Sequence, residues 1–358
     1  MGPVRLSDLP APPSGLQGFP WTEESNTKFE IRDLPKISII TPSFNQAQYL
    51  EQTIRSVLLQ NYPNLEYIII DGGSTDNSAE IITKYHPWLS YWVSEKDNGQ
   101  SDALNKGIKH CTGDIFNWIN SDDYLEANAL YQVADAFISK GAEVVCGNCR
   151  VFDEDKTVYT YRLWHAASIE QSVVMTSYNQ PSTFYAMAFV REFGTFNAQL
   201  HYCMDLEMWY KYFTKYGFEK VVAIDALLSH FRYHAGSKTI ALQDYFLWDR
   251  AKIIYSIARN FNLDKKTLLK LKFLDFDNYY QQNWDTRQLN PKRLKAYFYE
   301  WIALNFRKEL GGLAACKFYL KSITTAPFRN YYYTFYYLGM KYIGEDLRKQ
   351  IRNLLFRR

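Results

Sequence analysis

The amino-acid sequence predicts an α/β fold: a Rossmann-like, mostly parallel sheet flanked by helices, with a C-terminal helical extension. Strand and helix patterns alternate through the first half of the chain, polar clusters follow the predicted strands, and the composition changes near residue 241. Alternating strands and helices are typical of a parallel sheet with both faces covered. We therefore expect an extended N-terminal arm at 1–35, an α/β domain at 36–240, and a helical region rich in basic and aromatic residues at 241–358.

The N-terminal arm is expected from its polar composition. It carries six of the chain's 12 prolines and no apolar run long enough for a signal sequence. We expect this arm to be extended and partly disordered.

The composition of the whole chain limits its function classes. The chain has 358 residues and is 47% hydrophobic, so it can bury a large core. Its formal net charge of +3 gives no global field that would favour nucleic acid as a partner. No stretch reaches the roughly 18 uninterrupted apolar residues of a membrane-spanning helix.

The five cysteines are scattered, which is not the pattern of a disulfide framework. Cys146 and Cys149 form a C-x-x-C pair inside an apolar run, and no second pair follows, whereas a zinc site needs about four ligands. We expect reduced cysteines in a buried strand and a cytoplasmic location.

The spacing of apolar residues places the elements of the α/β domain in order. We expect strands at Ile37–Phe44, Leu65–Ile70, Leu89–Ser94, Asp114–Ile119 and Glu143–Val151. We expect helices at Gln46–Gln60, from Thr75 or Asp76 to Tyr85, at Gln100–Cys111 and at Leu125–Lys140. Residues 151–237 are less regular and are expected to complete the same domain.

Polar clusters follow four of the predicted strands, at 42–45, 71–76, 95–102 and 120–123. In parallel sheets, ligands bind at the carboxyl ends of the strands. Because these four ends share one edge of the sheet, the sequence predicts a binding site there.

The cluster Asn120-Ser121-Asp122-Asp123 favours a metal site. Two adjacent carboxylates repel each other unless a cation or a donor joins them. Oxygen-rich sites suit Mg²⁺ or Mn²⁺, which also bridge phosphate oxygens. An Asp-rich turn that caps a helix beginning at Leu125 is the alternative, and the four residues alone leave both open.

Two further loops carry polar residues that a ligand can use. Asp71-Gly72-Gly73-Ser74-Thr75-Asp76 allows a sharp turn and a close approach of the backbone, although a simple capped turn needs the same residues. The loop 95–107 places Asp102 and Lys106 at i,i+4, either as a solvated ion pair or as contacts to ribose or diphosphate near a helix start.

Taken together, six segments resemble the inverting family 2 glycosyltransferases of the GT-A fold. They are TPSFNQAQYLEQTIRSVLLQ, IIIDGGSTDNS, DNGQSDALNKGI, GDIFNWINSDD, QPSTF and MDLEMWYK, and the resemblance covers about Ile37 to Thr239. It implies transfer of a sugar from a nucleotide diphosphate-sugar to an acceptor hydroxyl with Mg²⁺ or Mn²⁺. It also implies a role in surface polysaccharide or glycolipid synthesis.

The resemblance implies roles for individual residues. The expected nucleotide-sugar contacts are Pro42, Ser43, Phe44, Asn45, Asp71, Gly73, Asp97, Asp102, Asn105, Lys106, Ser121 and Arg232. The expected metal ligand is Asp122, with Asp123 as a helper and His234 as a contact to the diphosphate or the metal, whereas Asn120 replaces the first acid of the family's D-x-D element. A structural histidine is the alternative for His234.

Asp205 matches the family's catalytic base, and its alternative is an acidic cap of the helix that follows. An Asp with a pKa of about 3.9 is a weak base, but the acceptor hydroxyl acidifies late, as the oxocarbenium-like state forms. Gln180, Pro181 and Ser182 resemble the family's acceptor-side loop, and an ordinary proline turn is their alternative.

The C-terminal residues 317–358 hold nine basic and two acidic groups. Their mixture with Tyr, Phe, Leu and Ile suits either an interfacial helix on anionic lipid or a helix that packs on the domain. Because lipid-linked acceptors are common in the family, the resemblance favours contact with the membrane surface.

Two other function classes stay open from the residues. A nucleotidyltransferase on a related scaffold would need a triphosphate loop after the first strand, where Pro42-Ser43-Phe44-Asn45 stands. A non-catalytic subunit that binds a nucleotide-sugar would not need both Asp122 and Asp205 in their motifs.

Overall fold

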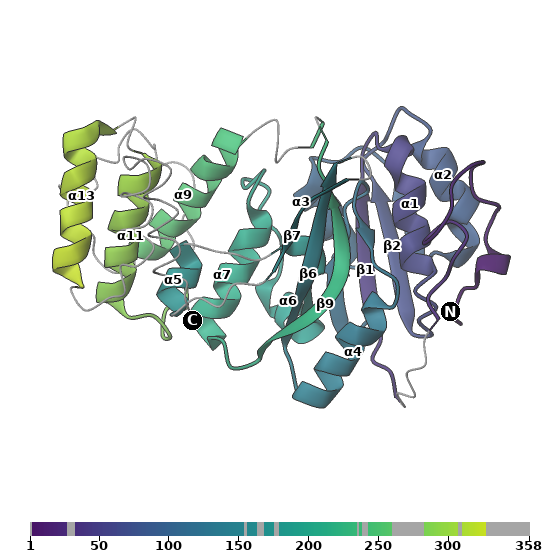
Figure 1. Ribbon diagram of the computed structural model, residues 1–358, viewed down its shortest axis with the longest axis horizontal. Coiled ribbons are helices and arrows are strands. Elements are labelled where there is room, and N and C mark those ends of the chain that lie inside the picture. Colours follow the sequence, from purple (N-terminus) through teal and green to yellow (C-terminus); the bar gives the residue numbers. More distant parts are fainter. Residues whose placement is uncertain are drawn as a thin grey trace, which may run out of the picture.

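The computed structural model describes residues 2–26, 33–153, 156–162, 168–174, 179–234, 236–237, 243–259, 283–306 and 310–326. Over these residues, nine strands form a single mixed sheet in the order β3-β2-β1-β4-β8-β6-β9-β5, with β7 paired to β6. Helices cover both faces of this sheet (Figure 1). The predicted α/β fold with a mostly parallel sheet and C-terminal helices is confirmed.

The first half of the sheet is parallel. It contains β1 (Ile37–Ser43), β2 (Leu65–Asp71), β3 (Tyr91–Ser94) and β4 (Ile115–Trp118). The crossover helices are α1 (Ala47–Leu58), α2 (Ser78–Tyr85) and α3 (Gln100–Ile108), and the short helix η2 (His86–Trp88) precedes β3. All predicted elements of this half are present, with ends that differ by a few residues.

The second half of the sheet mixes strand directions. Its strands are β5 (Tyr124–Leu125), β6 (Val144–Asp153), β7 (Lys156–Tyr161), β8 (Thr183–Ala186) and β9 (Val221–Arg232). Its helices are α4 (Ala129–Lys140), α5 (Ile169–Val174), α6 (Met187–Phe193) and α7 (Met204–Tyr216), with the short helix η3 (Gln180–Ser182) before β8. Because β8 is antiparallel to both β4 and β6, and β9 is parallel to β6, β9 ends at the same edge as β1 and β4.

Alternate residues of the central strands build two cores. Ile37 and Ile39 of β1 pack in the core beneath α1, α2 and α4, whereas Ile40 points to the core of α3, α7 and the C-terminal helices. In β2, Ile69 and Ile70 divide in the same way. This two-residue alternation is the geometry of a strand with both faces buried.

The predicted helix at Leu125–Lys140 begins later than expected. Tyr124 and Leu125 instead form β5, which pairs with the His230 and Ser229 end of β9. Asn128 then adopts a left-handed conformation with φ 63°, and the helix begins at Ala129. The strand pairing, a contact distant in sequence, overrides the local helical pattern.

The N-terminal arm packs on the domain over residues 2–26. It contains little regular structure, only η1 (Leu6–Asp8), but Val4 and Leu9 are buried in the core beneath α1. The buried guanidinium of Arg55 in α1 donates to the backbone carbonyls of Pro10, Pro20 and Trp21 at 2.9–3.0 Å. Because a buried charge needs partners, these bonds hold the arm against α1 over the part expected to be disordered.

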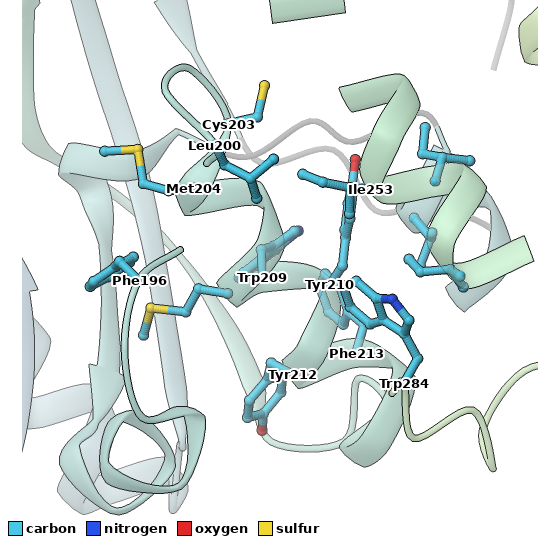
Figure 2. Close-up of a cluster of buried hydrophobic side chains, with 14 of the residues drawn as sticks. Phe196, Leu200, Cys203, Met204, Trp209, Tyr210, Tyr212, Phe213, Ile253 and Trp284 are labelled. Atoms are coloured by element: carbon cyan, nitrogen blue, oxygen red, sulfur yellow. The ribbon is translucent and has the colours of Figure 1, made fainter. Parts of the chain in front are cut away.

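The C-terminal region contributes α9 (Gln243–Arg259), α11 (Pro291–Asn305) and α13 (Gly312–Thr325). Figure 2 shows how α7 joins this region to the domain: Trp209, Tyr210 and Phe213 of α7 lie in one apolar cluster with Ile253 of α9 and Trp284. The helices therefore continue the core of the α/β domain. The basic tail 331–358 lies outside the described residues, as do most of the residues between α9 and α11.

Two further predictions concern cysteines and membrane spans. Cys146 and Cys149 lie buried and unbridged in β6, as expected. Burial raises the pKa of each thiol to about 12. Among the described helices, none has the length and hydropathy needed to cross a bilayer.

Candidate active site

The four polar clusters meet at the carboxyl edge of the sheet, as the parallel strand order requires. β1, β2 and β4 end there, and so does β9, which brings Arg232 and His234 to the same edge. The following contacts show which of the predicted site residues lie together.

Asp122 and His234 form the central pair of the site. Asp122 lies in the turn after β4, and His234 follows the end of β9, 112 residues later. His234 Nε2 lies 3.0 Å from Asp122 Oδ2, and the two side chains are 15% and 19% exposed. The ring of Tyr49, on α1, lies 4.9 Å from the His234 ring, measured between centroids. The pair is thus held in place yet open to a ligand.

Asp123 is turned away from this pair. Its side chain is buried, one oxygen accepts the backbone N–H of Arg232 at 2.9 Å, and the other accepts Asn120 Nδ2 at 3.2 Å. Burial and the nearby charge of Asp122 raise its pKa well above the ordinary value. Both oxygens are therefore engaged by the protein, and this geometry does not support the prediction that Asp123 helps to bind a metal.

Asn120 also serves the turn rather than a ligand. Its Oδ1 accepts a bond of 2.6 Å from Gln100 Nε2, at the start of α3. Together with the bond to Asp123, this contact links the turn after β4 to the loop before α3. The backbone carbonyl of Ser121, whose side chain is buried, accepts the hydroxyl of Thr53 in α1 at 3.0 Å. The whole turn is fixed from two helices.

Arg232 is a fixed part of the site. Its Nε donates to the carbonyl of Asp122 at 3.0 Å, and its Nη2 donates to Gln52 Oε1 at 2.6 Å. The guanidinium lies 4.5 Å from the ring centre of Tyr49 and 4.6 Å from that of Phe152. Arg232 therefore connects β9 to α1 and holds the backbone of Asp122.

Tyr49 and Gln52 were not among the predicted site residues. They stand three positions apart on α1, so they share one face of the helix. In the sequence, only the polar and aromatic character of these two residues on an otherwise apolar helix pattern could have indicated a role. Their role as contacts of Arg232 depends on β9, which lies far away in the sequence.

The residues present suit a divalent cation that is shared with a diphosphate. Asp122 and His234 offer one carboxylate oxygen and one imidazole nitrogen, a donor set that Mn²⁺ accepts and that Mg²⁺, which prefers oxygen, accepts less readily. Within the described part of the chain, no group of three His, Cys, Asp or Glu side chains gathers around one point. Phosphate oxygens and water commonly complete such a coordination shell.

The turn after β2 is built around a fully buried carboxylate. Asp71 accepts bonds from the backbone N–H of Ser74 at 2.9 Å, from its hydroxyl at 2.5 Å and from the hydroxyl of Ser94 at 2.6 Å. Gly73 takes φ 77°, in the left-handed region that favours glycine. The protein thus uses Asp71 to shape this turn.

Gly72 and Asp97 lie in close contact. A Cβ at Gly72 would come within 2.8 Å of Asp97 Oδ2, so any larger residue there would displace the Asp97 carboxylate. Asp97 is half-buried and accepts the backbone N–H of Gly99 at 2.8 Å, and burial raises its pKa. Its carboxylate reaches the same strand end as Asp71.

The loop between β1 and α1 combines an exposed ring with buried neighbours. Phe44 is 59% exposed, whereas Pro42 and Ser43 are buried at the end of β1. Asn45 locks this loop to the Asp71 turn, since its Oδ1 accepts the N–H of Thr75 and its own N–H donates to Ser74 Oγ, both at 2.8 Å. An exposed phenyl ring on a fixed loop can stack on a nucleobase.

The start of α3 carries a local charge network. Lys106 Nζ lies 2.8 Å from Glu95 Oε1 and 3.9 Å from Asp102, while Asp102 Oδ2 accepts the N–H of Asn98 at 3.0 Å. Both polar ends of the Asn105 side chain bond to the backbone of Phe196, at 2.9 and 2.7 Å. Asn105, predicted to bind the donor, therefore holds the segment that leads to α7.

The residues predicted on the acceptor side, Gln180, Pro181 and Ser182, lie beside the end of β4. Gln180 Nε2 donates to the carbonyl of Trp118 at 2.7 Å, and the carbonyl of Pro181 accepts Asn117 Nδ2 at 3.1 Å. Ser182 is fully buried, with its hydroxyl bonded to the carbonyl of Asn148, so this position does not support direct contact with an acceptor.

Asp205 lies in the first turn of α7 and is half-buried. The segment before it is held by Asn105 of α3, which begins at the donor-side loop. The fold thereby attaches the predicted base to the donor half of the site, although Asp205 comes from the second half of the domain.

Comparison with known proteins agrees with this architecture. Residues 38–204 match the family model described as glycosyl transferase family 2. An uncharacterized glycosyltransferase of Mycobacterium tuberculosis is 38% identical over 109 residues, which are 30% of this chain and 42% of that protein. An uncharacterized glycosyltransferase of Rickettsia typhi is 27% identical over 187 residues, 50% of this chain and 58% of that protein. The chain thus spans about two to three fifths of these relatives.

Solved structures share the fold at low sequence identity. S. aureus TarS 1-349 in complex with UDP has a TM-score of 0.52 at 15% identity, covering 80% of this chain and 88% of that one. The mannosyltransferase PcManGT from Pyrobaculum calidifontis, in complex with GDP-Man and Mn²⁺, has a TM-score of 0.50 at 15% identity, covering 87% and 84%. By its family match and its fold, the segment 38–204 is a glycosyltransferase family 2 domain of the GT-A type.

Proposed function

We propose that this protein transfers a sugar from a nucleotide diphosphate-sugar to an acceptor hydroxyl, with inversion and with a divalent cation. The observation that carries the proposal is the meeting of Asp122 and His234, 112 residues apart, at 3.0 Å on the edge where the donor-side loops end. A carboxylate and an imidazole that remain partly exposed there suit a cation bound to a diphosphate.

The residues of the donor side divide the work of binding. Phe44 offers its exposed face to the nucleobase, and Asp97 offers a half-buried carboxylate close to the Asp71 turn, within reach of ribose hydroxyls. Asp71 and Asn45 position these loops through their own bonds, whereas Arg232 positions Asp122. When bound by Asp122 and His234, Mn²⁺ or Mg²⁺ would neutralise charge on the departing diphosphate.

Asp205 is assigned the role of general base. The acceptor oxygen forms a bond to the anomeric carbon while the bond from that carbon to the diphosphate oxygen breaks. The hydroxyl proton passes to the Asp205 carboxylate, and the nucleoside diphosphate leaves. Because attack comes from the face opposite the leaving group, one displacement inverts the anomeric centre. A half-buried position limits competing water around this carboxylate.

The first experiment identifies the donor. Thermal unfolding is measured with UDP-, GDP- and dTDP-sugars in the presence of Mn²⁺, since a bound donor raises the unfolding temperature as its concentration exceeds Kd. Turnover of that donor is then followed by release of nucleoside diphosphate, and the product anomer is assigned by NMR. Release of pyrophosphate from a nucleoside triphosphate would support a nucleotidyltransferase instead.

The second experiment tests the residues. Asp205→Asn and Asp122→Ala are expected to lose at least roughly a hundredfold in kcat/KM, the scale of a lost general base or metal ligand. Asp135→Asn, an exposed carboxylate on α4, is the matched control and should keep full activity. Full turnover in both site variants would remove the assignment of roles.

A saccharide or lipid-linked acceptor in surface polysaccharide or glycolipid synthesis is the acceptor class that we propose. The predicted cytoplasmic location and membrane-surface contact stay predictions, and the tail on which the contact depends lies outside the described residues. Flotation with anionic liposomes, comparing the full chain with one that ends near Asn330, tests that contact. Equal flotation of the two chains would contradict it.

A further inference from the structure

The segment that leads into Asp205 is fixed from two sides. On the donor side, Asn105 bonds to both backbone polar groups of Phe196. On the opposite side, Asp249 of α9 accepts the backbone N–H of Tyr202 at 3.0 Å, and the Cys203 thiol donates to the carbonyl of Phe246 at 3.4 Å. The C-terminal helices therefore take part in shaping the entrance to α7.

The carboxylate of Asp249 is buried, and both of its oxygens are bonded. The residue is 3% exposed, and its other carboxylate oxygen lies 2.8 Å from Lys252 Nζ. A buried carboxylate is unfavourable unless its oxygens are bonded, so this one strongly prefers the observed position of the Tyr202 backbone. The bond to Asp249 thereby fixes the backbone from which the Tyr202 side chain projects.

Tyr202 stacks on Tyr245 in the first turns of α9. The ring centres lie 5.4 Å apart and the planes meet at 25°. Tyr245 is 56% exposed, and the exposed His201 lies beside Tyr202. This pair differs from the rings of α7, which lie inside the apolar cluster of Figure 2. Tyr202 is half-buried at the edge of that cluster, and Tyr245 extends the stacked pair toward solvent, an arrangement suited to ligand contact.

We propose that Tyr202 and Tyr245 form an aromatic platform that stacks on a sugar ring of the acceptor. The inference rests on the proposed function and names the substrate class on its acceptor side. Tyr202 precedes the predicted base Asp205 by three residues, so the platform and the base belong to one short segment at the start of α7. The C–H face of a pyranose meets the electron-rich face of tyrosine, while the phenol hydroxyls can bond to its hydroxyl groups.

The test measures binding of simple glycosides by saturation-transfer NMR. The probes are the methyl α- and β-pyranosides of glucose, galactose, mannose and N-acetylglucosamine, with the protein saturated with diamagnetic Mg²⁺ and the nucleoside diphosphate of its donor. The variants are Tyr245→Ala, Tyr202→Ala and the conservative Tyr245→Phe. Leu320→Ala, a 59% exposed apolar residue of α13, is the control for loss of an exposed apolar side chain.

At least one glycoside should bind the wild-type protein, with the strongest signals on its C–H face. Each alanine variant should weaken this binding roughly tenfold, the scale of one lost aromatic contact, while Tyr245→Phe and Leu320→Ala should keep it. The slow hydrolysis of the donor in the absence of acceptor should stay unchanged in Leu320→Ala and should remain measurable in the three tyrosine variants, because all four retain Asp122, His234 and Asp205.

Two results overturn different statements. If the donor is hydrolysed but no glycoside binds, or if the alanine variants bind as the wild type does, the platform is wrong and the proposed function stands. If no nucleotide-sugar binds or is hydrolysed by the wild-type protein, the proposed function itself fails.

Discussion

Arg232→Met removes the guanidinium that joins β9, α1 and the Asp122 turn. The substitution keeps a long apolar side chain between Tyr49 and Phe152 but loses the bonds to the Asp122 carbonyl and to Gln52. A hydrogen bond from a charged group contributes roughly 1.5–3 kcal/mol, and each cation–π contact roughly 0.5–1 kcal/mol at a partly exposed site.

The lower ends of these ranges apply, because the site is half-buried and water can replace part of each bond. Two bonds and two ring contacts then sum to roughly 4 kcal/mol, from which the retained packing of methionine leaves a loss of roughly 3 kcal/mol in the free energy of unfolding. Arg232→Lys keeps the charge but not the planar fork, so we expect most of this loss there too.

The assay is urea unfolding followed by tryptophan fluorescence, with Mn²⁺ affinity measured by electron paramagnetic resonance on the folded variants. Mn²⁺ affinity should fall roughly tenfold or more, since Arg232 orients the chain that carries Asp122. Arg287→Met is the control, an exposed arginine whose ion pair with Asp285 should matter little. A change within roughly 1 kcal/mol for Arg232→Met would refute the reasoning.

Three other predictions follow from single contacts. Gly72→Ala should weaken donor binding in the thermal-shift assay, because its Cβ would lie 2.8 Å from Asp97 Oδ2 and displace the carboxylate assigned to the ribose; a donor-induced shift equal to that of the wild type would contradict this. Asn105→Ala should lower kcat while leaving the KM for the donor unchanged, because its bonds to Phe196 serve the segment before Asp205; an equal rise in donor KM would return Asn105 to the donor site. Burial raises the pKa of Glu66, but bonds from Lys36, Ser38 and Thr112 outweigh burial and lower it to about 2. A folded-state pKa below the unfolded value of 4.5 stabilises the protein at higher pH, and this stabilisation is lost as Glu66 takes up a proton. The free energy of unfolding should therefore decrease as pH falls from 4.5 to about 2 in the wild type, and less steeply in Glu66→Gln, as urea midpoints at several pH values would show.

Local patterns predicted the elements of the first half well. The residues of β1 and β2 alternate between two cores, and the helices between them carry an apolar face, so each element is encoded within its own segment. The error at Leu125 arose where a short strand depends on β9, a partner about one hundred residues away. The packing of residues 2–26 on the domain was not predicted for a similar reason, because the anchor of this segment is Arg55 in α1.

Motifs predicted which segments reach the site but not what each side chain does there. Asp122 and His234 were both expected near a metal, and their contact at 3.0 Å is consistent with that expectation. Asp71 and Asp123 carry the same chemical group, yet the protein engages their oxygens with its own donors. A sequence motif records that a carboxylate stands at a strand end, whereas the direction of its oxygens depends on which N–H groups the fold brings to it.

The placement of Asp205 shows why the remaining part of the site could not be predicted from local sequence. Its segment is held by Asn105, 91 residues before Phe196, and by Asp249, 47 residues after Tyr202. Asn105 lies on α3 and Asp249 on α9. The sequence pattern of each helix indicates which face is buried, but not that these two side chains bond to the segment before Asp205. The two contacts act on opposite sides of one short segment, so a change in either shifts the same carboxylate. If Asp205 is the base, as proposed, its position depends both on α3 and on the C-terminal helices. Asp249→Ala should therefore lower kcat for transfer as Asn105→Ala does.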